Sequence, residues 1–276
     1  MARLGVTVKE IVDGIGAVYP YSDAEKWDKV GLLVGDETAI VQGIIFALEP
    51  RLETIEYARE KGANVIVTHH PAFVQTPDYA TSLGAHSGRV ILEAAKSGVA
   101  LINAHTNLDV SEDARHTIGD ALGLIAFREA MAACDIKQVP RVSRYAALWQ
   151  TTVPRSLAEM ARMAQQVYKA PMRVYGDPQK NIISVMTSTG AGGEHVVDAI
   201  AANADLLITG EVKYHDSVAA KECGVAVIEL GHDVSEWPLV PLLKEAVLAQ
   251  TFMSPERLFE MSPAPAWWTE TGEVYV

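Results

Sequence analysis

The chain has 276 residues, of which 49% are hydrophobic and 21% are charged, and its formal net charge at pH 7 is −12. These values indicate a globular protein of one or two domains, and the acidic charge offers no basic surface for nucleic acid or an anionic membrane. The sequence shows no signal segment, no apolar run of membrane-spanning length, and no metal or redox spacing of its two cysteines. We therefore expect a cytoplasmic protein that binds neither nucleic acid nor membrane.

The first part of the chain alternates between predicted helices and strands. Thr7 and Glu10 have the spacing of a capping box, which begins a helix that ends near Tyr19. The segment 27–35, bracketed by glycines, is either a strand bent at each glycine or part of a site wall. Further strands are expected over 43–48, 65–68 and 99–102, and further helices over 52–61 and from a Ser87 cap to Gly98.

The second part repeats this alternation. A helix is expected over 155–169, after Pro154, and another opens after the glycine-rich loop 189–193. Strand-helix-strand alternation predicts a largely parallel sheet covered by helices. The expected strands are 144–152, 181–186, 206–209 and 223–228, and the last two helices are 196–202 and 239–251.

The two parts also resemble each other in sequence. Residues 97–102 match 223–228 nearly letter for letter, and 63–70 parallel 204–211 in the same order. Internal repeats of this kind indicate a duplicated unit. We expect an α/β protein of two similar halves, domains 1–126 and 127–276, that flank a shared dinuclear metal cleft, with the C-terminal segment packing back on the first domain.

Histidines and carboxylates gather where the predicted strands end. In open α/β sheets, ligand sites lie at the carboxyl ends of the strands. A His-x-x-x-acid element follows one strand in each half, which places both groups on one face if the segment is helical. The candidates are His69, His70, His105 and Asp109 from the first half, and Glu211, His215, His232 and Glu236 from the second.

Imidazole and carboxylate groups without thiolate suit zinc, manganese, iron, cobalt or nickel. One ion takes three or four ligands, so this larger set fits two divalent metal ions bridged by a carboxylate, roughly 3.5–4 Å apart. Successive side chains of a strand alternate faces. His69 and His70 therefore reach one site only if the chain turns at the strand end, which Pro71 favours, and they would then contact different ions.

Other polar groups have simpler interpretations. His86, His116 and His195 are expected at the solvated surface. The loop 189–193 precedes a helix and could hold a phosphate, although it lacks the full spacing of a phosphate-binding loop. Glu211 and His215 are expected near the cleft as supporting or substrate-binding groups. The pair Trp267-Trp268 is expected to pack on the body or on a neighbouring subunit.

Five ordered motifs resemble those of the NIF-three-like family, whose members are catalogued as dinuclear metal-centre proteins or type 2 homologues of GTP cyclohydrolase I. They are Trp-Asp-x-Val-Gly-Leu at 27–32, Thr-His-His-Pro at 68–71, His-Thr-Asn-Leu-Asp at 105–109, Thr-Gly-Glu-x-Lys-Tyr-His at 209–215 and Gly-His-x-x-Ser-Glu at 231–236. The resemblance extends from the first helix to about residue 248. It implies two α/β domains around a di-metal site, in a homo-oligomer that is often a toroidal hexamer. Carried over by motif, the implied metal ligands are His69, His70, Asp109, His232 and the bridging Glu236, with His105 beside them.

Two functions remain open at this stage. The first is a metal-dependent hydrolase in which an activated water attacks a small, phosphorylated or nucleotide-like substrate. In it His105 or Glu211 would move protons, and His215 with Lys213 would contact the substrate. The second is a metal-binding regulatory, scaffold or metal-delivery protein, favoured by the lack of a dedicated nucleophile.

Overall fold

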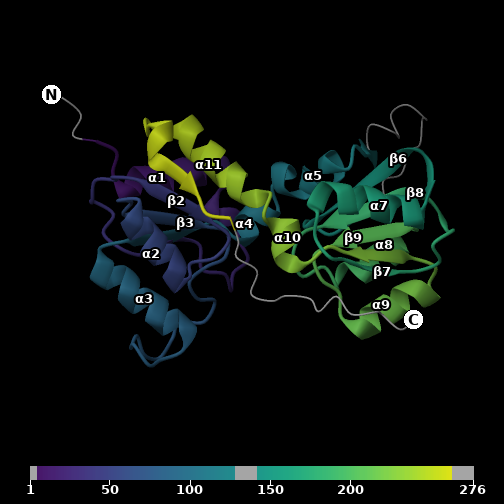
Figure 1. Cartoon of the computed structure of the whole chain (residues 1–276), viewed down its shortest axis with the longest axis horizontal. Coiled ribbons are helices and arrows are strands. Elements are labelled where there is room, and N and C mark those ends of the chain that lie inside the picture. Colours follow the sequence, from purple (N-terminus) through teal and green to yellow (C-terminus); the bar gives the residue numbers. More distant parts are fainter. Residues whose placement is uncertain (1–4, 128–141, 263–276) are drawn as a thin grey trace.

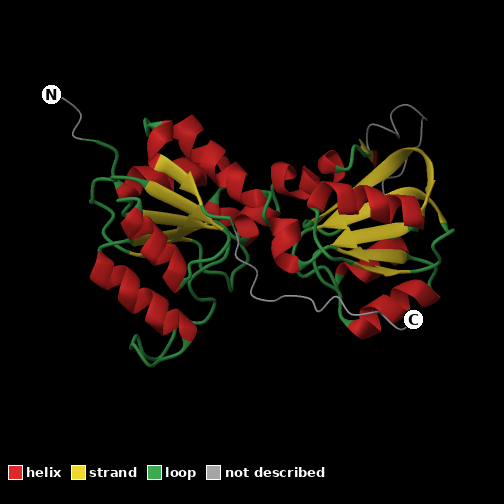
Figure 2. Ribbon diagram, viewed as in Figure 1, coloured by secondary structure: helices red, strands yellow, loops and turns green. Residues whose placement is uncertain are grey.

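A computed structural model describes residues 5–127 and 142–262 of the chain. Two α/β halves lie side by side along its longest axis, and α5 and α10 lie between them (Figure 1). Each half contains one sheet with helices on both faces (Figure 2). This arrangement confirms the predicted fold class of two similar α/β halves.

The first sheet has five strands in the order β1-β4-β3-β2-β11, where β1 is antiparallel to β4 and all other neighbours are parallel. Every residue of β2, β3 and β4 is buried, because helices cover both faces. Ile44 and Val65 face α1 and α11, whereas Ile45 and Ile66 face α2 and α3. The strands are β1 (Gly31–Val34), β2 (Ile44–Ala47), β3 (Val65–Thr68), β4 (Ala100–Asn103) and β11 (Leu258–Glu260).

The helices of the first half begin and end where local signals predict. Thr7 and Glu10 form the capping box of α1, and Gly62 and Gly98 follow α2 and α3 with φ of +64° and +66°. Ser87 is not a cap, because α3 begins at His86 after Ala85. The elements are α1 (Val8–Val18), the 3₁₀ turn η1 (Tyr21–Asp23), α2 (Leu52–Glu60), α3 (His86–Ser97), α4 (Thr106–Asp109) and α5 (Glu112–Ala121).

The second sheet has six strands in the order β5-β6-β8-β9-β10-β7, and β8, β9 and β10 are parallel. Pro154 does not begin the next helix: it lies inside β6, and α7 starts after a capping box of Ser156 and Glu159. The strands are β5 (Ile125–Ala126), β6 (Ala146–Ser156), β7 (Arg173–Tyr175), β8 (Asn181–Ser188), β9 (Leu206–Thr209) and β10 (Ala226–Glu229). The other elements are α7 (Leu157–Tyr168), α8 (His195–Ala201), α9 (Tyr214–Glu222), α10 (His232–Glu236), α11 (Leu239–Gln250) and the 3₁₀ turn η2 (Pro255–Arg257).

The duplication expected from the sequence is present in the topology. Strands β2-β3-β4 of the first sheet correspond to β8-β9-β10 of the second, and each set is parallel in the same order. An antiparallel strand, β1 or β7, pairs with the outer member of each set. In both halves the last strand of the set leads into a very short helix, α4 or α10, followed by a longer one.

Those longer helices cross between the halves. Ile118 and Leu122, from α5 and its end, are buried against Trp149 in the core of the second half. Leu239 and Leu243 of α11 are buried with Ile11 of α1 in the core of the first half. The two short helices therefore lie where the chain passes from one half to the other. The division at residue 126 stays a prediction about folding units.

Among residues 5–127 and 142–262, no helix has the length and apolar character needed to cross a bilayer. The pair Trp267-Trp268 lies outside the described residues.

Candidate metal centre

Two consecutive histidines follow β3 and face the same space. The chain bends at His69 and His70, and Thr68 Oγ1 donates a hydrogen bond to the His70 carbonyl at 2.7 Å. The two rings lie 5.0 Å apart with 41° between their planes. The turn expected at this strand end is therefore present, and it brings both imidazoles to one side.

The short helices α4 and α10 supply two carboxylates. Asp109 is the last residue of α4, and Glu236 is the last residue of α10. His232 begins α10, so the i,i+4 spacing places it on the same helix face as Glu236, and their Nε2 and Oε2 atoms are 3.0 Å apart. Residues from β3, α4 and α10, which belong to both halves, thus converge on one point.

Glu236 is the centre of this group, because each of its oxygens faces a different set of neighbours. Oε1 lies 3.7 Å from Nε2 of His69, which itself lies 3.4 Å from Oδ1 of Asp109. Oε2 lies 2.9 Å from Nε2 of His70 and 3.0 Å from Nε2 of His232. Glu236 therefore joins two triads of donor atoms, one with His69 and Asp109 and the other with His70 and His232.

All four histidines of the site hold their Nδ1 atoms against an acceptor. His69 Nδ1 donates to the Ala104 carbonyl at 3.0 Å, since a carbonyl can only accept. The other three Nδ1 atoms face carboxylates, at 3.4 Å for His70 and Glu49, 3.1 Å for His105 and Asp28, and 3.1 Å for His232 and Glu211. This is the arrangement in which a histidine presents Nε2 to a metal ion while its other nitrogen is held in place.

The positions of these donor atoms suit coordination of a divalent ion better than hydrogen bonds between the side chains. Within the described part of the chain, His69 Nε2, Asp109 Oδ1 and Glu236 Oε2 are buried atoms without a hydrogen bond. Nε2 of His70 and Nε2 of His232 approach the same atom, Oε2 of Glu236, at 2.9 Å and 3.0 Å. Ligands at about 2.0–2.2 Å from one ion lie roughly 3–3.5 Å from each other. The observed separations therefore suit atoms that converge on an ion.

Charge also accumulates at this point. Burial raises the pKa of Asp109, whose Oδ1 atom is buried. Burial would also raise the pKa of Glu236, but the imidazoles of His232, His69 and His70 outweigh it and hold the pKa well below its usual range. For His70, burial lowers the pKa, yet Glu236 and Glu49 raise it to about 10. The metal-free site is thus a cluster of carboxylates neutralised by protonated imidazole.

Of the remaining predicted residues, the structure brings two to the site and leaves one outside. His105 lies beside these donor groups, with its ring centroid 5.2 Å from that of His69 and 5.7 Å from that of His70. Glu211 is half exposed and contacts His232 from outside the cluster. His215 is exposed, contacts the Tyr214 ring, and lines neither pocket beside the cluster.

Asp28 is a site residue that the sequence did not single out, although the segment 27–35 was left open as a site wall. It is buried, and it accepts hydrogen bonds from Thr106 N at 3.1 Å and Thr106 Oγ1 at 2.6 Å as well as facing His105. Burial raises its pKa, but the hydrogen bonds from His105 and Thr106 prevail and lower it to about 2. Asp28 is therefore ionised, and Nδ1 of His105 carries the proton.

The glycine-rich loop 189–193 packs directly on the metal-site carboxylate. Gly190 has φ +61°, and a Cβ atom there would lie 2.1 Å from Oε1 of Glu236. Gly190 N donates to Ser235 Oγ at 2.9 Å, which fixes the loop to α10. The backbone of this loop approaches the Glu236 carboxylate closely, which explains the small residues of the loop. The helix that follows the loop, α8, has only seven residues.

The expectation that His195 is solvated is wrong. It is 4% exposed, and its Nδ1 lies 3.1 Å from Oδ2 of Asp198. Exposure depends on tertiary packing, and the loop 189–193 folds the start of α8 inward.

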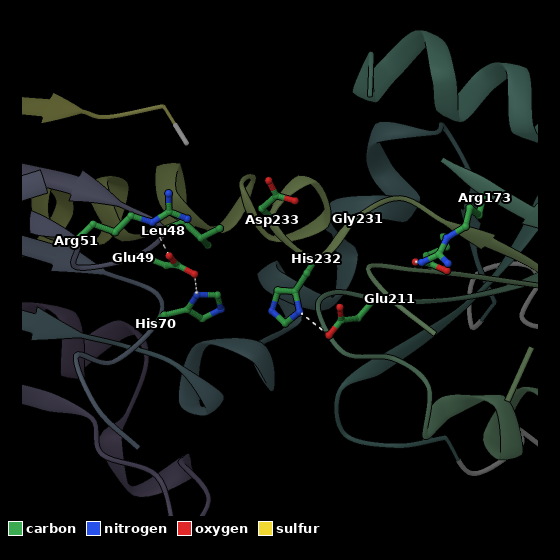
Figure 3. A pocket seen from close by; sticks show the side chains of 10 residues that line it. Leu48, Glu49, Arg51, His70, Arg173, Glu211, Gly231, His232 and Asp233 are labelled. Carbon is green, nitrogen blue, oxygen red and sulfur yellow. Dashed lines mark hydrogen bonds and ion pairs between the residues drawn. The ribbon is translucent and has the colours of Figure 1, made fainter. Parts of the chain in front are cut away.

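Two pockets of about 580 Å³ each flank the cluster, and both are lined by His70 and His232. Figure 3 shows the first, here called the arginine pocket, with Arg51 on the wall from the first half and Arg173 on the wall from the second. Its other lining residues are Leu48, Glu49, Glu211, Glu229, Gly231 and Asp233. The second, here called the aromatic pocket, is also lined by Glu25, Trp27, His105, Thr106, Asp109, Tyr145, Thr189, Ala191, Glu194, His195 and Glu236.

The model of the family Duf34/NIF3 (NGG1p interacting factor 3) matches residues 6–261. The chain belongs to this family. A Clostridium acetobutylicum protein named GTP cyclohydrolase 1 type 2 homolog is 30% identical over 246 residues, which is 88% of this chain and 90% of that protein. A Streptomyces coelicolor protein of the same name is 30% identical over 238 residues, 84% of this chain and 82% of the relative. The resemblance expected from the five motifs is thereby confirmed.

Two solved structures share the fold of this chain. Staphylococcus aureus protein SA1388 superposes with a TM-score of 0.81 at 24% identity, over 96% of this chain and 99% of that one. TTHA1606 from Thermus thermophilus superposes with a TM-score of 0.75 at 21% identity, over 95% of this chain and all of that one (100%).

Proposed function

We propose that this member of the Duf34/NIF3 family is a dinuclear metal-dependent hydrolase. The observation that carries the proposal is the arrangement around Glu236: its two oxygens face two separate triads, and each histidine of those triads has its Nδ1 atom held. A carboxylate placed between two ligand sets is the bridge of two-metal sites. His69 and Asp109 would hold one ion, His70 and His232 the other, and Glu236 both.

Two bound divalent ions would lower the pKa of water and neutralise negative charge that develops on a substrate. The chain's own groups hold and move protons beside them. Ionised Asp28 keeps the His105 proton on Nδ1, so Nε2 is the atom of His105 that can accept a proton in the aromatic pocket. Glu211 orients His232 through Nδ1 and would not itself contact an ion. The exposed His215 is a substrate contact only for a ligand that extends beyond the pockets.

The substrate class that we propose is a small phosphorylated or nucleotide-like molecule. Support comes from the relatives named GTP cyclohydrolase 1 type 2 homolog and from the size of the two pockets, which suits a nucleotide rather than a polymer. A homo-oligomer, with a hexamer as the expected form, belongs to this proposal through the family resemblance. Light scattering of the purified chain would measure its mass.

The test begins with metal content. Protein purified without added metal, and protein reloaded after chelation, should contain two divalent ions per chain by elemental analysis. Glu236→Gln should lose both ions because the bridge is shared, whereas His105→Gln should retain them. Loaded wild-type protein should then turn over at least one member of a panel of phosphoesters, nucleotides including GTP, and cyclic amides, and His105→Gln should reduce that rate.

The results separate the proposed hydrolase from its alternative. Two bound ions without turnover across the whole panel would contradict the hydrolase and favour a metal-binding regulatory, scaffold or metal-delivery role. Binding of a single ion would contradict the dinuclear centre itself.

A further inference from the structure

The aromatic pocket contains rings that the proposed metal chemistry does not use. Trp27, Tyr145 and His195 line it but belong to none of the ligand triads. Trp27 is 54% exposed, so a molecule that enters this cavity can contact its ring. Ligand pockets are commonly lined by aromatic side chains together with a few placed polar groups.

Each half of the molecule contributes one pair of rings to this pocket. Trp27 packs edge-on against His105, with centroids 6.2 Å apart and 77° between the planes. Tyr145 lies 6.4 Å from His195 with 38° between the planes. A planar ring that enters the pocket therefore meets aromatic surface from both halves, and such rings associate by offset stacking or edge-to-face contact.

Three of these four rings are held in position by carboxylates, and Trp27 packs on one of the three. Tyr145 Oη donates to Glu25 Oε1 at 2.6 Å, and His195 and His105 face Asp198 and Asp28 through Nδ1. The bond from Tyr145 also joins the second half to the segment that carries Trp27. Rings fixed before a ligand arrives lose little conformational entropy on binding, so this wall is preorganised.

The polar groups of the pocket select the kind of ring. The carboxylates of Glu25 and Glu194 accept hydrogen bonds and cannot donate them when ionised. Among the described residues that line the aromatic pocket there is neither lysine nor arginine, whereas Arg51 and Arg173 line the other pocket. A ring that carries N–H donors therefore matches these carboxylates, and an anionic group finds no lysine or arginine among the described residues that line this pocket.

We infer that the aromatic pocket binds a planar heteroaromatic ring bearing amino or ring N–H donors, as a nucleobase does, against Trp27 and Tyr145. The inference rests on the proposed function, because it names the part of the substrate that would be held beside the metal centre. It also assigns the aromatic pocket, and not the arginine pocket, as the side from which that ring approaches.

Calorimetry of nucleoside binding tests this assignment. Guanosine, adenosine and cytidine, whose bases carry amino groups, are titrated into manganese-loaded and chelator-treated protein, with ribose 5-phosphate as the probe without an aromatic ring. At least one nucleoside should bind saturably, and Trp27→Ala should weaken it by about tenfold or more, the usual effect of removing a stacked ring. Tyr145→Leu should weaken binding as well, and Tyr145→Phe, which keeps the ring, less so.

Two matched variants locate the effect. Tyr79→Ala removes another exposed aromatic ring, 76% exposed and outside both pockets, and should leave nucleoside binding unchanged. Arg173→Ala changes the arginine pocket only and should also leave it unchanged. The inference is overturned if no nucleoside binds in the millimolar range, or if folded Trp27→Ala binds as the wild type does. If nucleosides bind but no substrate is turned over, the proposed hydrolase is contradicted and the ring site is not. If substrates without an aromatic ring are turned over at a rate that Trp27→Ala does not change, the ring site is contradicted and the hydrolase is not.

Discussion

Asp28 faces His105 across 77 residues of sequence, with its carboxylate 3.1 Å from the histidine Nδ1. The same carboxylate accepts two hydrogen bonds from Thr106, so it fixes both the ring of His105 and the start of α4. One buried acid thus sets the geometry of a helix that ends on Asp109, a candidate metal ligand.

Asp28→Asn should therefore impair the site without removing its ligands. The amide has one acceptor oxygen where the carboxylate has two, and its NH₂ group faces donors, so the free energy of unfolding should fall by about 1–3 kcal/mol. Urea denaturation of the metal-free protein measures this loss. Asp13→Asn, a change at an exposed carboxylate, is the control and should alter stability little. Equal stability of the two variants would contradict the role assigned to Asp28.

Gly190→Ala tests the close approach of the loop 189–193 to Glu236. The left-handed backbone at φ +61° costs a residue with a Cβ about 1–2 kcal/mol, and the new atom would also displace Oε1 of Glu236. We expect a loss of stability together with a loss of bound metal, measured by denaturation and elemental analysis.

Gly62→Ala is the matched control for Gly190→Ala. Gly62 has φ +64° and no atom within 4 Å of an added Cβ, so it reports the backbone cost alone. Its metal content should equal that of the wild type. If Gly190→Ala also retained its full metal content, the contact between the loop and Glu236 would have no part in holding an ion.

Metal binding should release protons. Burial lowers the pKa of His70 and His232, but the facing carboxylates, Glu236 foremost, raise these pKa values to about 10 and about 9. Both imidazoles are therefore protonated between pH 6 and 8 in the metal-free protein, and each must lose its proton to bind an ion. Two protons released correspond to an apparent affinity that rises by up to about a hundredfold per pH unit in this range.

Calorimetric titrations of metal in buffers of different ionisation enthalpy would count these protons. A binding enthalpy that does not depend on the buffer would contradict the prediction. Because the folded-state pKa values are raised, these two imidazoles stabilise the metal-free fold at low pH, fully so below the unfolded value near 6.5, and that contribution is lost as the pH rises through 9 and 10.

Glu211→Gln should leave the His232 ring less well oriented, and this should lower the affinity for metal without abolishing metal binding. Oε1 of Glu211 lies 3.1 Å from Nδ1 of His232, and removing such a supporting carboxylate costs about 10–100-fold in metal affinity. Competition with a chromogenic chelator measures the change. Glu194→Gln, at another exposed carboxylate beside the site, should leave the affinity unaltered; if both variants bound metal as the wild type does, Glu211 would have no orienting role.

Much of the fold and the composition of the site could be predicted from local patterns. Runs such as Val65–Thr68 are almost entirely apolar because both faces of the sheet are covered. The parallel strands of one sheet end at one edge, which is why His69 and Asp109 could be assigned to one edge of the first sheet. The repeat of 97–102 in 223–228 predicted two similar halves and so placed His232 in the same site, and the matching strand order of the two sheets agrees with that duplication.

What could not be predicted depends on contacts between distant segments. Nothing near Asp28 in the sequence indicates that it faces His105, and His195 follows a glycine-rich loop and a glutamate although packing buries it. Pro154 predicts a helix start, but the helix begins only at Leu157, because β6 pairs with β8 as far as Ser156 and the capping box begins at Ser156.

The crossing of α5 and α11 has a consequence for how the molecule is assembled. Helix α5 of the first half packs in the core of the second half, and α11 packs in the core of the first half. The short helices that precede them, α4 and α10, end on Asp109 and Glu236. Cutting the chain at residue 126 would leave each fragment with an open core and with an incomplete set of ligands. The candidate metal centre is thus complete only after the two halves have exchanged these helices, and an ion bound there would hold the two halves together.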